Sequence, residues 1–317
     1  MAALTFYTYN LSGERCKAEN ILSFELSKSL NAPCDGLRLT YLRSGSADEI
    51  SRVEVFDGEK KIFNGFCDTQ QEETDSDGIV SFIYARSSIC LLVDNQAQPC
   101  IYQSPSAESL FIKNARQFGF VNAMPNIYCD SLYQVSNGVS CYAAINSFVN
   151  GITGKRVMAD AHNRLLVPDE NGTVNLNDYT VLSEKRIINR GQALTVIDYK
   201  INSSEDYVYH CKSRFAERQG IKTSKKVNVS SLPEWQRKYT LSNMLHAGSS
   251  KYYSVELMLD GCCDFSLYDK VFYKNGCMDI RGDYFVSAVS IFCDSKGEST
   301  KLTLYKNIDS EEINYVD

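Results

Sequence analysis

The stretch VEVFDGEKKIF, residues 53–63, carries the clearest fold signal in the chain. Apolar and polar residues alternate on both sides of Asp57-Gly58, as they do in strands that bury one face. An Asp-Gly pair between two alternating runs favours a tight turn, because glycine adopts the positive φ that such a turn requires. The stretch therefore predicts an antiparallel β-hairpin.

Similar runs flank this hairpin. Residues 21–26 and 37–42 alternate on either side of the turn-rich sequence NAPCDG, and residues 79–86 alternate after an acidic loop at 72–78. Short alternating runs separated by turn residues are typical of antiparallel sheets. We therefore predict a first small β-barrel or sandwich over residues 1–102.

The spacing of apolar residues changes to a helical period in the middle of the chain. Ser104-Pro105 is typical of a helix start and Gly119 of a helix end, with an apolar stripe between them. A second apolar stripe predicts a helix over residues 140–150, which Gly151 would end, and a short hairpin follows it. These elements predict a small α+β domain over residues 103–180.

Strand-like runs return in the C-terminal part, interrupted by one possible helix from Pro233 to about residue 245. We predict a second small barrel built from residues 181–231 and 278–308, a small domain inserted at 232–277, and a disordered acidic tail at 309–317. The predicted fold class is mainly β with an α+β insertion: two small antiparallel β-barrels, a small α+β domain and a second small insertion.

An internal similarity links the two predicted barrels. Gly65, a strand, an acidic loop ended by glycine and a strand at 79–84 follow the same plan as Gly282, a strand, a loop to Gly297 and a strand at 300–305. One interpretation is that β-hairpins resemble one another; the other is that the chain carries two copies of one barrel.

Composition limits the classes of function. The chain of 317 residues has a net charge of −6, so it is a poor candidate for non-specific binding to nucleic acid, which needs a basic patch. Hydrophobic residues make up 44% and charged residues 23%, as in ordinary globular proteins. The N-terminus does not have the pattern of a signal peptide, and no apolar run is long enough to predict insertion into a membrane.

Twelve cysteines are scattered along the chain, most of them inside apolar runs. In the reducing cytoplasm that the missing signal peptide predicts, we expect them to be small buried side chains without disulfides. The best metal candidate combines His246 with Cys262, Cys263 and Cys277. Neighbouring residues on a strand point to opposite faces, so Cys262 and Cys263 would not reach one ion, and we predict no metal and no cofactor.

Motifs for catalysis are absent from the sequence: it contains no Gly-x-Ser-x-Gly, no His-Glu-x-x-His and no phosphate-binding loop. Glu72, Glu73, Asp75 and Asp77 could suggest the carboxylates of a glycoside hydrolase. They lie together on one predicted hairpin tip, whereas hydrolases hold two carboxylates across a cleft. We therefore expect a solvated loop and no catalytic residues. The single tryptophan, Trp235, is expected to be a core or interface anchor rather than a sugar platform.

The order of elements resembles the phage tail baseplate hub family, which includes the late control protein D type and the hubs of phage Mu and of defective Bacillus prophages. The resemblance rests on the strand that ends in Ala85-Arg86-Ser87, on the Leu-Leu-x-Asp turn at 91–94, and on the helix that follows from Ser104. Gly282-x-Tyr-x-Val and the strand at 297–304 are similar to the closing strands of the family. Residues 267–270, Leu-Tyr-Asp-Lys, depart from the Pro-Gly-Asp often found there, which leaves the edge of the insertion open.

The resemblance implies a structural, non-enzymatic hub. Such a hub is a homotrimer that joins a sixfold tail tube to a threefold tip or spike and lines the ejection channel, with other baseplate proteins as partners and DNA only as passing cargo. The chain would be assembled in the bacterial cytoplasm and end in the virion tail. In this context we expect Glu72, Glu73, Asp75 and Asp77 to contact the tube or the lumen. A carbohydrate-binding adhesin of the tail tip and a peptidoglycan hydrolase stay open as alternatives.

Overall fold

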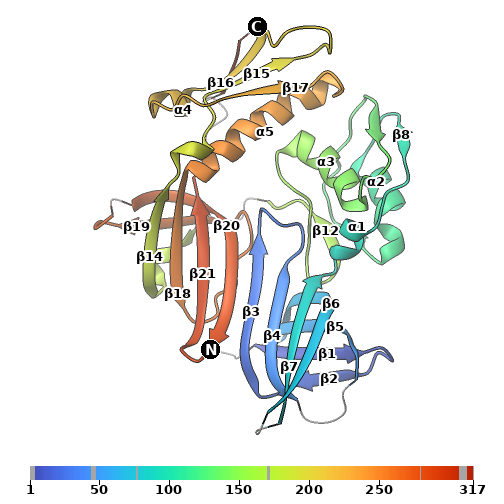
Figure 1. Ribbon diagram of the computed structural model, residues 1–317, viewed down its shortest axis with the longest axis vertical. Coiled ribbons are helices and arrows are strands. Elements are labelled where there is room, and N and C mark those ends of the chain that lie inside the picture. Colours follow the sequence, from blue (N-terminus) through green and yellow to red (C-terminus); the bar gives the residue numbers. More distant parts are fainter. Residues whose placement is uncertain are drawn as a thin grey trace.

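The computed structural model describes residues 4–43, 48–75, 78–169, 172–278, 280–306 and 313–316. It is mostly β-structure (Figure 1). The strands are β1 (Thr5–Asn10), β2 (Arg15–Ala18), β3 (Ile21–Ser29), β4 (Gly36–Arg43), β5 (Ile50–Asp57), β6 (Lys60–Asp75), β7 (Gly78–Ser87), β8 (Cys100–Tyr102), β9 (Val121–Asn122), β10 (Tyr133–Val135), β11 (Met158–Ala159), β12 (Arg164–Leu166), β13 (Val174–Asn175), β14 (Val181–Ile188), β15 (Val196–Lys200), β16 (Tyr209–Ser213), β17 (Ser224–Asn228), β18 (Tyr253–Asp260), β19 (Lys270–Asn275), β20 (Ile280–Asp294), β21 (Gly297–Tyr305) and β22 (Ile313–Val316). The helices are α1 (Cys90–Asp94), α2 (Ala107–Asn114), α3 (Cys141–Thr153), α4 (Arg214–Arg218) and α5 (Glu234–Tyr252), with 3-10 turns η1 (Arg116–Phe118), η2 (Leu176–Asp178) and η3 (Arg190–Gln192).

Thirteen strands form one large sheet. Its order is β14-β18-β21-β20-β3-β4-β7-β6-β5-β1-β2, and β19 and β13 branch from β20. The predicted mainly β class with α+β parts is confirmed. The predicted division into two separate barrels is not observed, because β20 pairs with β3 and the two halves share one sheet. The described strands of this sheet do not form a closed barrel.

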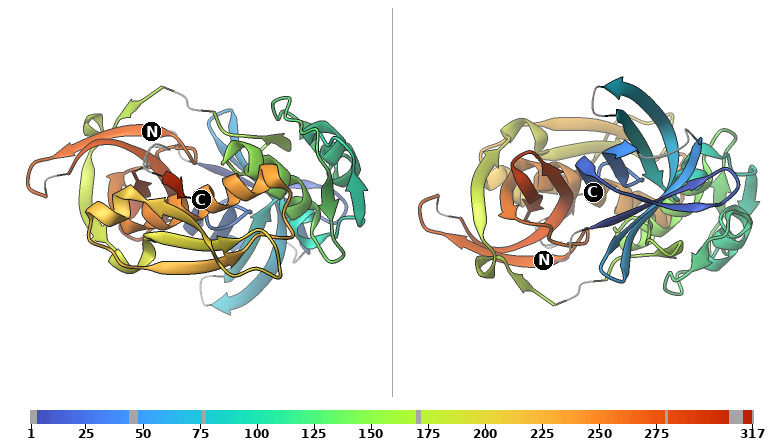
Figure 2. Two further views of the ribbon diagram at one scale, coloured as in Figure 1. Left: turned by 90° about the horizontal axis from the view of Figure 1, so that it is seen from above. Right: turned by 90° about the horizontal axis from the view of Figure 1, so that it is seen from below.

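The two halves of this sheet repeat one strand plan. The order β3-β4-β7-β6-β5 in the first half matches β14-β18-β21-β20-β19 in the second, with antiparallel pairing throughout both. Viewed from below, the halves lie side by side (Figure 2). The structure therefore favours the second interpretation of the internal similarity, two copies of one unit.

One apolar core serves both halves. It includes Leu26, Leu37 and Val55 from the first half and Leu302 and Ile291 from the second, all essentially inaccessible to solvent. The alternation that predicts the strands places these side chains on one face of each strand. Burial of this continuous apolar face is the main source of free energy that holds the halves together.

A second core belongs to the α+β part and runs from Ile89 to Val167. The helix start differs from the prediction: Ser104 has a φ of 50°, and Ser106 is the N-cap, its side chain accepting a hydrogen bond from the backbone N–H of Ser109. Gly119 ends the segment with a φ of 80°, as predicted.

The end of α3 also lies beyond its predicted position. The helix continues through Gly151 to Thr153, and Gly154 caps it with a φ of 71°. A side chain at position 151 would meet the ring of Trp235 at 3.3 Å, so this glycine allows α3 to pack closely against α5. Close packing, rather than a helix end, explains the glycine at 151.

A third part consists of a segment inserted between β14 and β18, joined by β22 from the C-terminal segment. Its four-stranded sheet has the order β17-β15-β16-β22, and α5 packs against it with a core of Ile197, Leu241 and Leu245. The segment that leaves the large sheet covers residues 189–252, whereas the predicted insertion covers 232–277. Ile313–Val316, in the segment expected to be disordered, form β22 and pair with β16.

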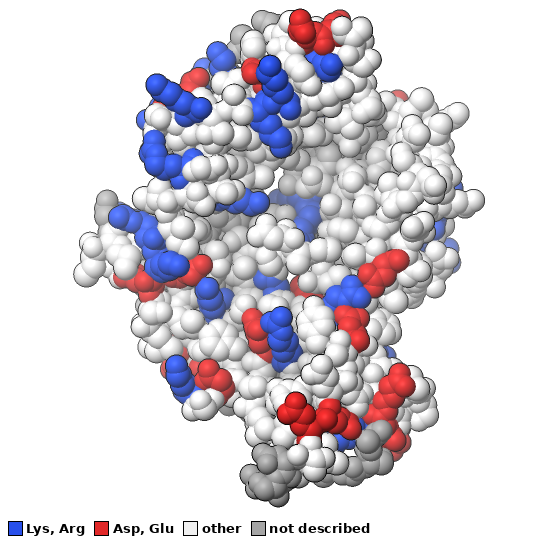
Figure 3. All heavy atoms as spheres, in the orientation of Figure 1, with Lys and Arg blue, Asp and Glu red and all other residues white. Residues whose placement is uncertain are grey.

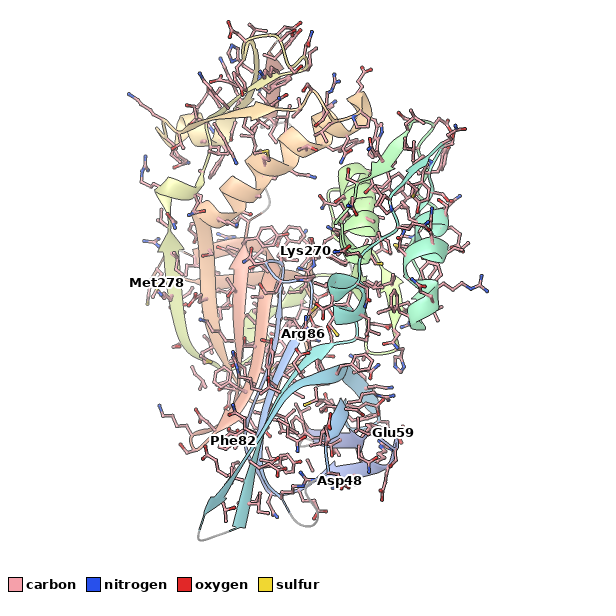
Figure 4. All side chains as sticks on the ribbon, turned by 45° about the vertical axis from the view of Figure 1, so that its right-hand side comes forward. Asp48, Glu59, Phe82, Arg86, Lys270 and Met278 are labelled. Atoms are coloured by element: carbon pink, nitrogen blue, oxygen red, sulfur yellow. The ribbon has the colours of Figure 1, made fainter. Side chains whose placement is uncertain are left out.

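The α+β part is fixed to the large sheet by two arginines. Arg86, labelled in Figure 4, lies at the end of β7 and bridges Asp68 on β6 and Asp94 on α1, with 2.7 Å to the latter. Arg156 is buried and donates to the carbonyl oxygens of Ser29, at 2.8 Å, and Pro33, at 3.3 Å. These contacts join segments that are far apart in the sequence.

Replacing Arg156 with alanine is expected to lower the free energy of unfolding by about 2–4 kcal/mol, because buried carbonyl groups lose their charged donor. Arg38→Ala is the matched control: it removes an ion pair to Glu25 from an arginine that is 70% exposed, and should cost about 0.5 kcal/mol or less. Urea unfolding measures both. Equal effects of the two substitutions would contradict the anchoring role of Arg156.

Glu54 is a buried carboxylate in the first half of the sheet, only 3% exposed. It accepts hydrogen bonds from the Tyr9 hydroxyl at 2.6 Å, from Lys61 Nζ at 2.9 Å and from Arg52. Burial on its own would raise the pKa of Glu54, but these hydrogen bonds hold the pKa below its ordinary value.

A carboxyl with a lower pKa in the folded than in the unfolded state stabilises the fold above the unfolded pKa, and this contribution is lost as the pH falls through the folded value. We therefore expect the unfolding free energy to fall below about pH 4.5, the ordinary value of a glutamate. Glu54→Gln should flatten this decrease, measured by urea unfolding between pH 3 and pH 7 (about the range that carboxyl titration covers). An unchanged slope in the variant would contradict this assignment.

Candidate functional site

The described part of the predicted acidic loop, residues 72–75, lies towards the free end of the β6–β7 hairpin, at the bottom of Figure 1. Glu72 and Glu73 lie near the end of β6. Glu72 accepts hydrogen bonds from Arg43 on β4 and, at 2.9 Å, from Gln70. Glu73 is exposed and makes no ion pair with any described residue. Asp77 and the side chain of Asp75 lie outside the described residues.

This end of β6 also has an unpaired edge. β6 pairs with β5 only through Lys60–Phe66, while its pairing with β7 continues to Asp75. Residues 69–74 therefore have a neighbouring strand on one side only, among the strands that the structure describes. Unpaired backbone groups on a strand edge are a template for pairing with another chain.

The second free edge is β14, the first strand in the order of the large sheet. It pairs with β18 alone among the described strands. Leu182 and Ile188 are more than half exposed, and Lys185 and Arg186 are exposed between them. This strand could not be predicted from the sequence, because its burial does not alternate with a period of two. These two edges are the candidate interaction sites of the large sheet.

Charge is distributed unevenly over the molecule. Residues 189–252 carry 11 Lys and Arg but 5 Asp and Glu, although the whole chain is acidic. In Figure 3 blue side chains gather at the upper end and red ones at the lower end. Tyr207 lies between Lys200 and Lys226, whose Nζ atoms are 5.1 and 5.6 Å from its ring centre. The acidic character is therefore a property of the large sheet and not of the inserted part.

A cleft of about 1030 Å³ lies where the large sheet, α3 and α5 meet. Lys155, His246 and Lys251 contribute to its lining, and none of the described residues that line it is acidic. Burial lowers the pKa of His246 below its ordinary value. Without a carboxylate partner for this imidazole, the cleft does not offer the acid–base pair that a hydrolase needs.

The other two histidines do not line this cleft. His210 Nδ1 lies 2.7 Å from Asp198, and His162 is exposed on a turn. Among the described residues, no three His, Cys, Asp or Glu side chains lie close enough to hold a metal ion, so the set proposed around His246 is not brought together. Trp235 packs against Phe148, with ring centres 5.9 Å apart, and joins α5 to the second core.

The cysteines are free thiols, and most are at least partly buried. Burial raises the pKa of Cys34 and of Cys262 to about 12, so both are protonated at neutral pH and are poor nucleophiles. No helix in the described part of the chain is long and apolar enough to cross a membrane.

We expect a maleimide to label Cys16 and Cys277 first in the native protein, because these two thiols are exposed. Cys34 and Cys262 should react slowly until the chain unfolds. Mass spectrometry of peptides after timed labelling measures the order. Rapid labelling of Cys34 or Cys262 would contradict their burial and reopen the question of a reactive thiol.

The fold has close counterparts among solved structures. A 43 kDa tail protein of prophage MuSo2 from Shewanella oneidensis superposes with a TM-score of 0.77 at 12% identity, covering 96% of this chain and 98% of that one. A tail protein from Neisseria meningitidis gives 0.72 at 12% identity, with 96% of each chain covered. Prophage tail protein gp18 from Listeria monocytogenes gives 0.62 at 14% identity, over 97% and 96%.

No family model and no curated protein sequence matches the chain. The likeness is therefore one of structure, and it covers all three parts of the molecule, including the insertion between β14 and β18. The fold expected from the resemblance to baseplate hubs is confirmed: this chain has the fold of phage and prophage tail proteins.

Proposed function

We propose that this chain is a structural, non-enzymatic hub of a phage or phage-like tail baseplate. Three copies would form a ring that joins a sixfold tail tube to a threefold tip or spike and surrounds the channel through which DNA passes. The chain would be assembled in the host cytoplasm and reside in the virion tail. The observation that carries this proposal is the repeat: two sheet halves of one strand plan in each chain.

The repeat addresses a problem of symmetry. A sixfold tube presents six equivalent sites, whereas a threefold tip presents three, and each docking surface must match its partner. Three chains with two similar halves each offer six similar surfaces on one side of a ring. Parts that occur once per chain, such as the insertion at 189–252, would offer three. The fold shared with three tail proteins over nearly the whole chain supports this assignment.

The acidic hairpin tip remains a proposed contact with the tube or the lumen. Glu72 and Glu73 belong to a hairpin that extends beyond the body of the molecule (Figure 1), and the proposal includes Asp75 and Asp77 from the sequence. A projecting hairpin can reach a neighbouring protein of the tail without moving the sheet from which it grows. Its carboxylates would favour a basic surface of the tube protein.

The native mass of the purified chain under reducing conditions tests the proposed trimer. We expect three times the chain mass of 35.7 kDa, measured by light scattering after gel filtration. A chain that stays monomeric both alone and with its tube protein would contradict the proposal.

A cell-wall zymogram tests the non-enzymatic part of the proposal. We expect no clearing, because the described residues that line the large cleft offer His246 no carboxylate partner. A clearing band that disappears on mutation of His246 would instead support the hydrolase alternative. Retention of the chain on immobilised cell-wall glycans would favour the adhesin.

A further inference from the structure

The two sheet halves can be aligned residue by residue, because each carries the same irregularity. In the first half the pairing of β6 with β7 shifts between Cys67 and Thr69. In the second half the pairing of β20 with β21 shifts between Val286 and Ala288. A bulge fixes the register of a strand, so Thr69 and Ala288 occupy equivalent positions.

A second bulge aligns the outer strands. The pairing of β3 with β4 shifts between Ile21 and Ser23, and that of β14 with β18 shifts between Val181 and Ser183. The two sequences are Ile-Leu-Ser and Val-Leu-Ser, with an exposed leucine inside each bulge. Ser23 and Ser183 are therefore equivalent, which makes β14 the counterpart of β3.

Within the chain, the second half joins the first through β20 and β3. Ala288 lies opposite Ser29 in an antiparallel ladder that continues to Cys293 opposite Phe24. The counterparts of these two strands, β6 and β14, have no such neighbour among the described strands. Each chain thus carries one completed junction and the two separate edges of a second junction of the same kind.

We propose that β6 of one copy pairs antiparallel with β14 of the next copy, in the register of the β20–β3 junction. This register places Glu73 opposite Lys185 and Glu72 opposite Arg186. The positions follow from the alignment alone. Glu73 and Lys185 are equivalent to Phe292 and Glu25, which lie opposite each other within the chain. Glu72 and Arg186 are equivalent to Ile291 and Leu26, which also lie opposite each other. The inference rests on the proposed function for the number of copies in the ring, but not for the pairing.

Charge supports this register independently. The bulge alignment takes no account of side chains, yet it brings two consecutive carboxylates opposite two consecutive cations. Opposite charges on directly facing residues of an antiparallel pair are favourable, and like charges are unfavourable. The other terminal strand of the sheet, β2, carries Arg15 and Lys17 and would place cations opposite those of β14. β6 is therefore the better partner for β14.

The pairing would also cover an exposed apolar side chain and allow the copies to form a closed ring. Ile188 of β14 is 51% exposed and would be covered by the edge of β6 at Gln70. Since the two edges belong to different strands, the contact is heterologous, and copies related by it form a ring when the rotation closes. Junctions within and between chains would then alternate around the ring.

Single charge reversals test the pair. Glu73→Lys and Lys185→Glu each place like charges face to face and should weaken assembly about tenfold per contact. Neither residue makes an ion pair with a described residue, so the fold of a single copy should be unaffected. The double variant Glu73→Lys/Lys185→Glu restores an attractive pair and should regain the assembly of the unmodified chain. Glu59→Lys and Lys222→Glu, at exposed positions away from both edges, are controls with the same charge changes.

Sedimentation over a range of concentrations measures assembly, and hydrogen exchange locates the contact. We expect the amides of residues 69–74 and 184–188 to become protected when copies assemble. Assembly that is unaffected by both reversals and leaves these segments unprotected would overturn the pairing while leaving the hub proposal intact. A chain that stays monomeric at about 100 μM, where even a micromolar contact is nearly saturated, would contradict the pairing itself.

Discussion

The antiparallel junction between β20 and β3 is the contact on which the rest of the structure depends. It spans six residue pairs and joins a strand from the C-terminal part of the chain to one from the N-terminal part. Ile291 and Leu26 face each other there and are both buried in the common core. Because β20 pairs with β21 on its other side, this one ladder converts two similar units into a single sheet. The α+β part and the insertion are attached to that sheet. The strand pairing between the halves is made by β20 and β3.

The same junction explains a difference between the inner and outer edges of the sheet. Where the halves meet inside the chain, the equivalent positions hold Ile291 and Leu26; at the outer edges they hold Glu72 and Arg186. Charged residues on an exposed edge strand discourage indiscriminate pairing of strands, because most wrong partners leave a charge unpaired. An edge that must remain soluble before assembly and select one partner afterwards is therefore expected to be charged.

Much of the sheet could be predicted from the sequence, since period-two alternation and turn residues are local signals. The hairpin at 53–63 is β5 and β6, and the strands at 21–26, 37–42 and 79–86 are β3, β4 and β7. β14 could not be predicted in this way: it is an edge strand with exposed residues on both faces. The insertion was consequently placed at 232–277 instead of between β14 and β18. Its limits depend on which strands pair, and pairing is not a local property.

The role of the acidic hairpin tip stays a prediction. Glu72 and Glu73 stand out in the sequence, but the ion pair of Glu72 with Arg43 does not, because Arg43 is distant along the chain. The proposed facing residue Arg186 is more distant still. A comparison of Ile21-Leu22-Ser23 with Val181-Leu182-Ser183 could have revealed the counterpart of β3, although three residues are too few to be distinguished from chance without the bulge that each contains. The structure supplies that bulge, and with it the alignment of β14 with β3.

We propose that one strand plan, used twice in each chain, forms a ring by repeating a single kind of junction. A single-particle electron microscopy map of the assembled chain, at a resolution that separates strands, tests it most directly. We expect a closed ring in which β6 of each copy lies beside β14 of the next, so that junctions within and between chains superpose. A ring that leaves either of these edges exposed to solvent, or that joins copies through the inserted part alone, would contradict it.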